Sequence, residues 1–148
     1  MNMTASARNP WKSYRQISMQ TAPPGQLILM LYDGAILFSE RALTGFASTD
    51  PGERNLTINN NLQRATDIVR ELNVCLDLDA GGQLAQTLRD LYDYMERRLL
   101  ESNFKKRRAG VDEVIVHLKE LREAWATMLA SQGQPQPEAD TRPEWQTN

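Results

Sequence analysis

The stretch INNNLQRATDIVRELNVCL, residues 58–76, decides the fold class of this chain. Its apolar side chains recur at alternating intervals of four and three residues, a mean period of about 3.5 that places them in one stripe along a helix. The opposite face is polar and charged, so this helix needs other helices against which to bury its stripe. The stripe consists of Ile58, Leu62, Ala65, Val69, Leu72 and Leu76.

Three further segments have a helical pattern, and none alternates with period two as a strand would. We expect helices over residues 24–47, 51–76, 83–103 and 111–130. Four amphipathic helices joined by short connections predict an all-α fold, an antiparallel up-down four-helix bundle with a short N-terminal cap segment. The stripes of the last two helices are Leu84, Leu88, Leu91, Met95 and Leu99, and Val114, Leu118, Leu121, Trp125 and Met128.

Two short stretches predict helix boundaries. In ASTDPGE, residues 47–53, Asp50 is suited to cap the second helix, Pro51 to open it and Glu53 to complete a capping box. The stretch DLDAGG, residues 77–82, is expected to break the chain before the third helix.

The 148 residues predict a single domain. Residues 1–10 carry no clear pattern, and residues 131–148 hold three prolines and almost no aliphatic side chains, so both are expected to be disordered. The folding unit is then 11–130, made of a cap segment, 11–22, and the bundle, 23–130. A unit of this size can bury roughly two-thirds of its unfolded surface, enough for a core without metal or disulfide.

Composition excludes several classes of protein. Seventeen Lys and Arg against nineteen Asp and Glu give a net charge of -2, which argues against general nucleic-acid binding. A single cysteine cannot form an internal disulfide and fits a reducing compartment. No secretory signal opens the chain, and no apolar run approaches the roughly 20 residues of a membrane span. We expect a cytosolic protein without stable membrane insertion.

The candidate residues for catalysis or metal binding do not form a recognisable site. A di-iron bundle needs two Glu-x-x-His motifs, whereas His117 is the sole histidine and is expected as a flanking surface residue. Cys75, beside Leu76, is expected as a buried, inert thiol. The basic run KKRR, residues 105–108, is expected to be a solvated loop. We therefore expect no catalytic residue, no metal and no cofactor, and no enzyme.

The first helix is unusually apolar. Its opening, GQLILMLYDG, residues 25–34, has six apolar residues in a row. At 100° per residue most of the helix's apolar side chains share one arc of about 180°, but Leu29, Met30 and Leu37 lie on or beside the polar side. Either these are scattered exposed aliphatics without significance, or a second layer covers them, supplied by the chain's own N-terminus or by a partner.

A candidate for that second layer lies upstream, in the cap segment. Trp11, Tyr14 and Ile17 offer large apolar side chains in a piece too short to be a stable helix alone. They either dock as a displaceable lid or complete the core at one end, and periodicity does not separate the two.

At these residues the sequence resembles the FliS family of flagellin-specific flagellar export chaperones. The resemblance starts in YRQISMQTAPPGQLILMLYDGA, at Tyr14, and continues through ATDIVRELNVCLD, LRDLYDYMERRLLESN and LKELREAWATML, in order and at matching spacing. It covers residues 11–129. The family often has serine before the helix-opening proline, where this chain has Pro23, and the C-terminal tail has no assigned counterpart.

The resemblance implies a bundle that holds the disordered C-terminal segment of flagellin along its outside, prevents premature polymerisation in the cytosol and supports export by the flagellar type III secretion system. It also implies that the cap segment covers part of this surface and moves aside for the client. Other flagellar export or regulatory proteins are further candidate partners. The client contacts expected are Leu29, Met30, Leu37, Tyr94 and Leu100, and the cap residues are Trp11, Tyr14 and Ile17.

A different class of function stays open on the residues alone. The surplus apolar surface of the first helix would also suit a structural helical bundle that dimerises through this helix and has no client.

Overall fold

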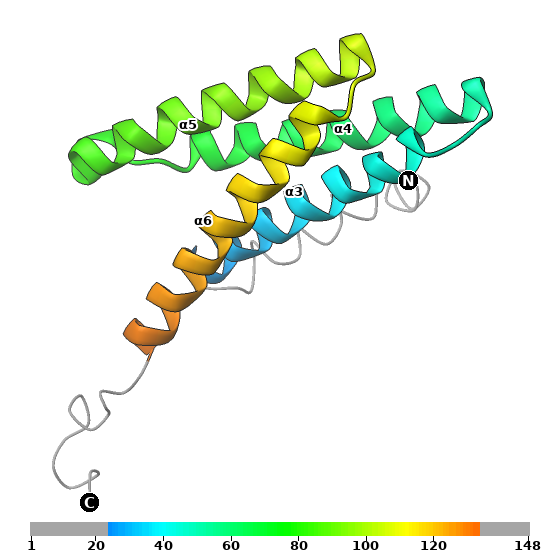
Figure 1. The fold of residues 1–148 in the computed structure, drawn as a ribbon. Helices are drawn as coiled ribbons and strands as arrows, with labels where there is room; N and C mark the ends of the chain where they lie inside the picture. The colour runs from blue at the N-terminus through cyan, green and yellow to red at the C-terminus, as the bar shows by residue number, and fades with distance from the viewer. Residues whose placement is uncertain (1–23, 134–148) are drawn as a thin grey trace, which may run out of the picture.

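The computed structural model describes residues 24–133, and its four helices form an antiparallel up-down bundle (Figure 1). The predicted fold class is thereby confirmed, and no strand occurs in this range. The cap segment and the residues before it lie outside the described range, as do residues 134–148. The helices are α3 (Pro24–Phe46), α4 (Pro51–Val74), α5 (Leu78–Lys105) and α6 (Ala109–Gly133).

The helices are arranged as a ring in which α3 packs against α4 and α6, and α5 packs against the same two. The α3–α4 pair makes the most extensive contact, and small buried residues such as Ala42 and Gly45 let these two helices approach closely. None of the described helices is long and apolar enough to cross a membrane.

The core follows the predicted stripes in α3 and α4. The five stripe residues within α4 are buried, and the sixth, Leu76, lies just past the end of the helix and packs partly buried against the core. In α3, the arc predicted to face the bundle does so. Its buried members are Leu31, Tyr32, Ala35, Phe38 and Ala42.

One polar pair lies inside this core. The hydroxyls of Tyr32 in α3 and Tyr92 in α5 are 2.5 Å apart and satisfy each other, as buried polar groups generally must. Burial raises the pKa of both hydroxyls, so both stay protonated at any physiological pH. The pair therefore links α3 to α5 without placing a charge in the core.

α4 begins at Pro51 as predicted, but its capping bonds and the start of α5 differ from the prediction. α5 begins at Leu78, five residues early, because the Asp77 carboxylate accepts the Ala80 N–H at 3.0 Å, and a non-helical Gly82 (φ 58°) then interrupts the helix. The Asp50 side chain makes no capping bond. Its own N–H, the group that Glu53 would reach in a capping box, donates instead to the Ser48 hydroxyl at 3.3 Å.

Two apolar predictions near the α4–α5 turn are wrong. Cys75 is exposed, because α4 already ends at Val74 and the cysteine lies in the turn that follows. Leu84, expected in the α5 stripe, is 69% exposed. The second error has wider consequences, because it belongs to a graded loss of burial along α5 and α6.

Candidate functional site

The contact between α5 and α6 changes along its length. Where α5 ends and α6 begins, the stripe residues Leu99, Val114 and Leu118 are fully buried. Where α5 begins and α6 ends, the same two stripes emerge into solvent. We call the first region the closed end and the second the open end. The open end consists of Leu84, Leu88 and Leu91 of α5 and Leu121, Trp125 and Met128 of α6, all of which are partly or largely exposed.

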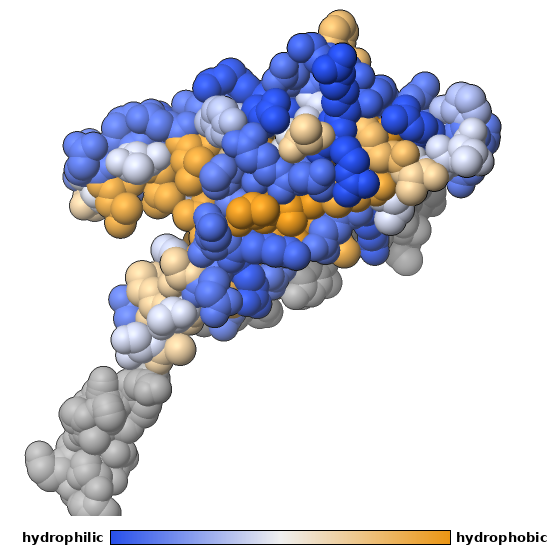
Figure 2. Space-filling model, in the orientation of Figure 1, coloured by the Kyte–Doolittle hydropathy of each residue, from blue (hydrophilic) through white to orange (hydrophobic). Residues whose placement is uncertain are grey.

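The divergence of the two helices accounts for this gradient. Figure 1 shows α5 and α6 close together near their connection and spreading apart along their length. Of the neighbouring pairs, α5 and α6 make the least contact. Figure 2 shows apolar side chains gathered between the hydrophilic surfaces of these helices. The open end is therefore an apolar groove for which the described part of the chain supplies no third helix.

A polar cluster marks the edge of the closed end. The Tyr94 hydroxyl donates to one carboxylate oxygen of Glu113 at 2.6 Å, and Arg98 Nε donates to the other at 2.8 Å. Both side-chain hydrogen bonds found between the described parts of α5 and α6 thus end on Glu113. The bond from Tyr94, followed by that from Arg98, lowers the pKa of Glu113. His117 lies on the same side of α6, with Nε2 3.5 Å from Glu113.

The second half of α6 follows α3 instead of α5. The Trp125 indole N–H donates to the Gly25 carbonyl at 2.9 Å, and Arg122 Nε pairs with Asp33 at 2.6 Å. Gly25 permits this approach, since a Cβ there would lie 2.5 Å from Leu129 Cδ2. With α6 held on α3, its side toward α5 is left uncovered at the open end.

Three of the predicted client contacts belong to α3, and Leu29 lies between Gly25 and Asp33 on the side that contacts α6. Leu37 is 42% exposed, and Leu29 and Met30 are partly exposed. These three remain a candidate surface. The predicted cap residues Trp11, Tyr14 and Ile17 lie outside the described residues.

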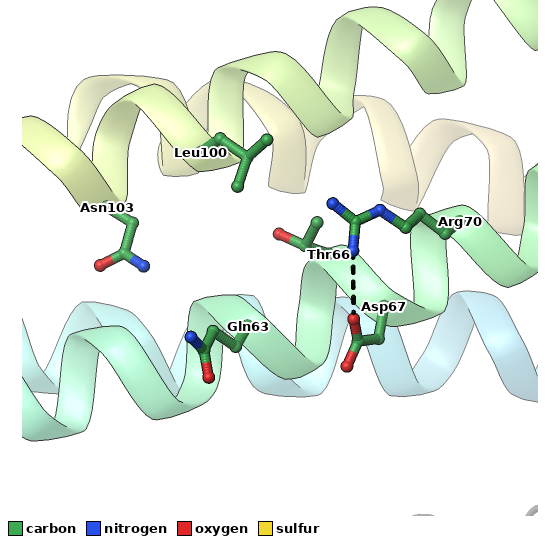
Figure 3. Close-up of a pocket in the computed structure, with 6 residues that line it drawn as sticks. All are labelled: Gln63, Thr66, Asp67, Arg70, Leu100 and Asn103. Atoms are coloured by element: carbon green, nitrogen blue, oxygen red, sulfur yellow. Dashed lines mark hydrogen bonds and ion pairs between the residues drawn. The ribbon is translucent and has the colours of Figure 1, made fainter.

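The remaining two predicted contacts lie on other surfaces. Tyr94 belongs to the polar cluster between α5 and α6. Leu100, 46% exposed, lines a groove of about 300 Å³ between α4 and α5 (Figure 3). Arg70 and Asp67, 3.5 Å apart, and Asn103, bonded to Asn59 at 2.9 Å, also border this groove. The five predicted contacts are therefore spread over three faces of the bundle.

The basic run at the α5–α6 connection is engaged in local contacts. Lys105 pairs with Glu101 at 3.1 Å, and Arg108 pairs with Asp112 at 3.0 Å. Lys106 ends α5 in a left-handed conformation (φ 51°), and its ammonium group donates to the Asn103 carbonyl. Within residues 24–133, no three His, Cys, Asp or Glu side chains are grouped to hold a metal ion.

These features describe an all-α helical bundle with exposed apolar side chains in its described range. The family model described as flagellar protein FliS matches residues 7–132. The chain is 34% identical over 125 residues to the flagellar secretion chaperone FliS of Bacillus subtilis (strain 168), covering 84% of this chain and 90% of that protein. It is 36% identical over 119 residues to the protein of the same name from Salmonella typhimurium (strain LT2), covering 77% and 85%.

The chain belongs to the FliS family, a family of chaperones and not of enzymes. Its role is in flagellum biogenesis, and its partner is a substrate of flagellar export. The match ends at residue 132, so residues 133–148 lie beyond it.

Proposed function

We propose that this chain is a cytoplasmic chaperone that binds the disordered C-terminal region of flagellin, prevents its premature polymerisation and supports its export through the flagellar type III secretion system. The observation that carries the proposal is the open end, where none of the four described helices covers the two apolar stripes. A disordered client that folds on binding must offset its ordering cost, and a long apolar surface provides the means. An amphipathic helix laid in such a groove is a common mode of recognition.

The distribution of apolar surface favours an extended client over a compact one. Leu29, Met30 and Leu37 lie on α3, whereas Tyr94 and Leu100 lie on two sides of α5. Only a chain that wraps around the bundle would contact all five. A segment that is disordered when free can do so, and a rigid folded partner cannot.

The N-terminal cap is the second part of the proposal. Trp11, Tyr14 and Ile17 would cover the outer face of α3 until the client displaces them, and a weakly held cap lowers the net affinity in a way that suits release. Deleting residues 1–17 should then increase the binding of a hydrophobic dye. Unchanged dye binding by a folded deletion variant would count against the cap.

Calorimetry with a peptide of the flagellin C-terminal region tests the proposed function. We expect binding heat and, by circular dichroism, a gain of helix. Leu37→Glu should weaken binding several-fold, whereas Val116→Glu, at a 55% exposed position on the outside of α6, serves as the control. Absence of heat at tens of micromolar with both components intact would overturn the proposal. A dimer whose mass is unaffected by peptide in sedimentation would favour the structural bundle instead.

A further inference from the structure

We propose that the C-terminal tail of this chain, residues 134–148, docks Trp145 into the open end between α5 and α6 and competes there with the client. The docking itself rests on the groove and on the sequence of the tail. Only the competition rests on the proposed function.

The groove is apolar, and no residue of the described range 24–133 covers it on the side of α6 that faces α5. Along α6 this side begins with Glu113 and His117 and continues at helical spacing through Ala124 and Met128. Ala124 and Met128 are exposed, and Met128 retains 36% of its accessible surface. Across the groove, Leu84 of α5 retains 69%. The groove therefore has exposed apolar side chains on both helices.

The tail starts beside this groove. α6 ends at Gly133, and Met128 and Trp125 lie five and eight residues before that end, or about 7.5 and 12 Å along the helix axis. Trp145 follows Gly133 by twelve residues, which span about 37 Å when fully extended at about 3.1 Å per residue. Trp145 can thus reach the α6 side of the open end of its own chain.

The composition of the tail suits an apolar groove with a single anchor. Trp145 is its one large apolar side chain, and Pro135, Pro137 and Pro143 restrict the backbone around it. Trp125 and Met128 offer an aromatic ring and a thioether, both favourable contacts for an indole. Proline-containing segments are commonly recognised in aromatic-lined grooves.

Because the tail and the groove belong to the same chain, a single anchoring side chain, Trp145, is sufficient for docking. A short linker holds its ligand at an effective concentration of about a millimolar, so a contact too weak to be seen between separate molecules is populated within one chain. A client that makes many contacts along the bundle would still displace it. The tail is preferred to a second copy as the occupant because it begins next to the groove and pays no cost of association.

Disulfide trapping in the full-length chain tests the docking without any client. In a Cys75→Ser background, which removes the exposed native thiol, Ala124→Cys is paired with Gln146→Cys next to the anchor. The control pairs Ala130→Cys with Gln146→Cys. Ala130 is also exposed, but it is turned about 120° from Ala124 around the helix and is nearer to the tail in sequence, so tethering alone favours the control.

We expect the intramolecular disulfide to form about fivefold or more faster in the Ala124 pair, and Trp145→Ala to abolish this advantage. Equal rates, a faster control or an advantage that survives Trp145→Ala would overturn the docking. Disulfide-linked dimers in the Ala124 pair would also overturn it and point to a second copy in the groove.

The competition is tested separately, with the flagellin peptide. Removing residues 134–148 should lower the Kd about three- to tenfold, because the client no longer displaces the tail. An unchanged Kd would overturn the competition. If no peptide binds to either form, the proposed function fails, while the trapping result still decides whether the tail docks.

Discussion

The closed and open ends of the α5–α6 contact have the same kind of sequence pattern, but their apolar side chains are buried at the closed end and exposed at the open end. Both are apolar stripes with intervals of four and three residues. At the closed end, Leu99 and Leu118 are fully buried beside the Glu113 cluster. At the open end, Leu84 and Met128 face solvent because α6 has turned toward α3. Periodicity thus identifies the apolar side of a helix but does not determine what covers it.

Substituting alanine for one stripe residue at each end should give the largest difference in unfolding free energy between the two ends. Leu118→Ala at the closed end should cost about 2–5 kcal/mol of unfolding free energy, since the fully buried site would be left with a cavity. Met128→Ala at the open end should cost less than about 1 kcal/mol, since water already reaches its side chain. Urea unfolding followed by circular dichroism measures both. Equal losses would contradict the division into two ends.

Substitution of a glycine at the closed end should cause the next largest loss of stability. Gly110 is buried at the start of α6, and a Cβ there would overlap the Ser102 hydroxyl and lie 3.2 Å from the Arg98 carbonyl oxygen. Gly110→Ala should therefore cost about 1–3 kcal/mol.

Gly52 is the matched control for that substitution, because nothing lies within 4 Å of its added Cβ. Gly52→Ala should leave stability unchanged or raise it by up to about 1 kcal/mol through better helix propensity. Thermal unfolding of both variants decides this. A tolerated Gly110→Ala would show that α5 and α6 are not tightly packed at the closed end.

A charge introduced into the groove should weaken binding of the client peptide without a matching loss of stability. Leu84→Glu at the open end and Val116→Glu on the outside of α6 both alter exposed positions, so each should change stability by less than about 0.5 kcal/mol. Leu84→Glu should weaken the flagellin peptide about five- to tenfold in calorimetry, since a carboxylate would be buried under the client. If the two variants bind alike, the open end is not part of the client surface.

The smallest expected effect is the pH dependence of the stabilisation that Glu113 provides. The pKa of Glu113 is depressed in the folded protein, chiefly by the Tyr94 hydrogen bond, relative to an ordinary value of 4.5. Its stabilisation is therefore present above about pH 4.5 and is lost as pH falls through the lower folded pKa. Glu113→Gln should cost about 0.5–1 kcal/mol at pH 7, as expected for a partly solvated cluster, and progressively less below pH 4.5.

Urea unfolding at several pH values measures this dependence, and Glu123→Gln, at an exposed position on α6, is the control. A penalty for Glu113→Gln that does not shrink in acid would mean that the carboxylate charge is not what stabilises the closed end.

The sequence predicts most of this fold because four helices and their apolar sides depend on local spacing. The α4 stripe and the inner arc of α3 are predicted residue by residue. The open end could not be predicted, since it depends on two contacts between distant residues. Trp125 bonds to Gly25 across 100 residues, and Arg122 pairs with Asp33 across 89. Nothing in the intervals of the α6 stripe indicates that its second half follows α3.

Local chemistry also limited the prediction of helix ends. The Ser48 hydroxyl accepts the N–H that a capping box at Asp50 would have used, and Asp77 starts α5 within the stretch expected to break the chain. On the functional side, Leu29, Met30 and Leu37 remain predictions. Their exposure leaves them available to a partner and does not identify it.

Hydrogen–deuterium exchange of the full-length chain, with and without the flagellin C-terminal peptide, tests the role of the open end most directly. Without peptide, we expect residues 84–91 and 121–130 to exchange faster than residues 95–105 and 111–118, because local opening is easiest where burial is least. With peptide, the first two segments should slow markedly and the last two should change little. Bound peptide that leaves residues 84–91 and 121–130 unprotected would contradict the assignment of the open end as the client groove.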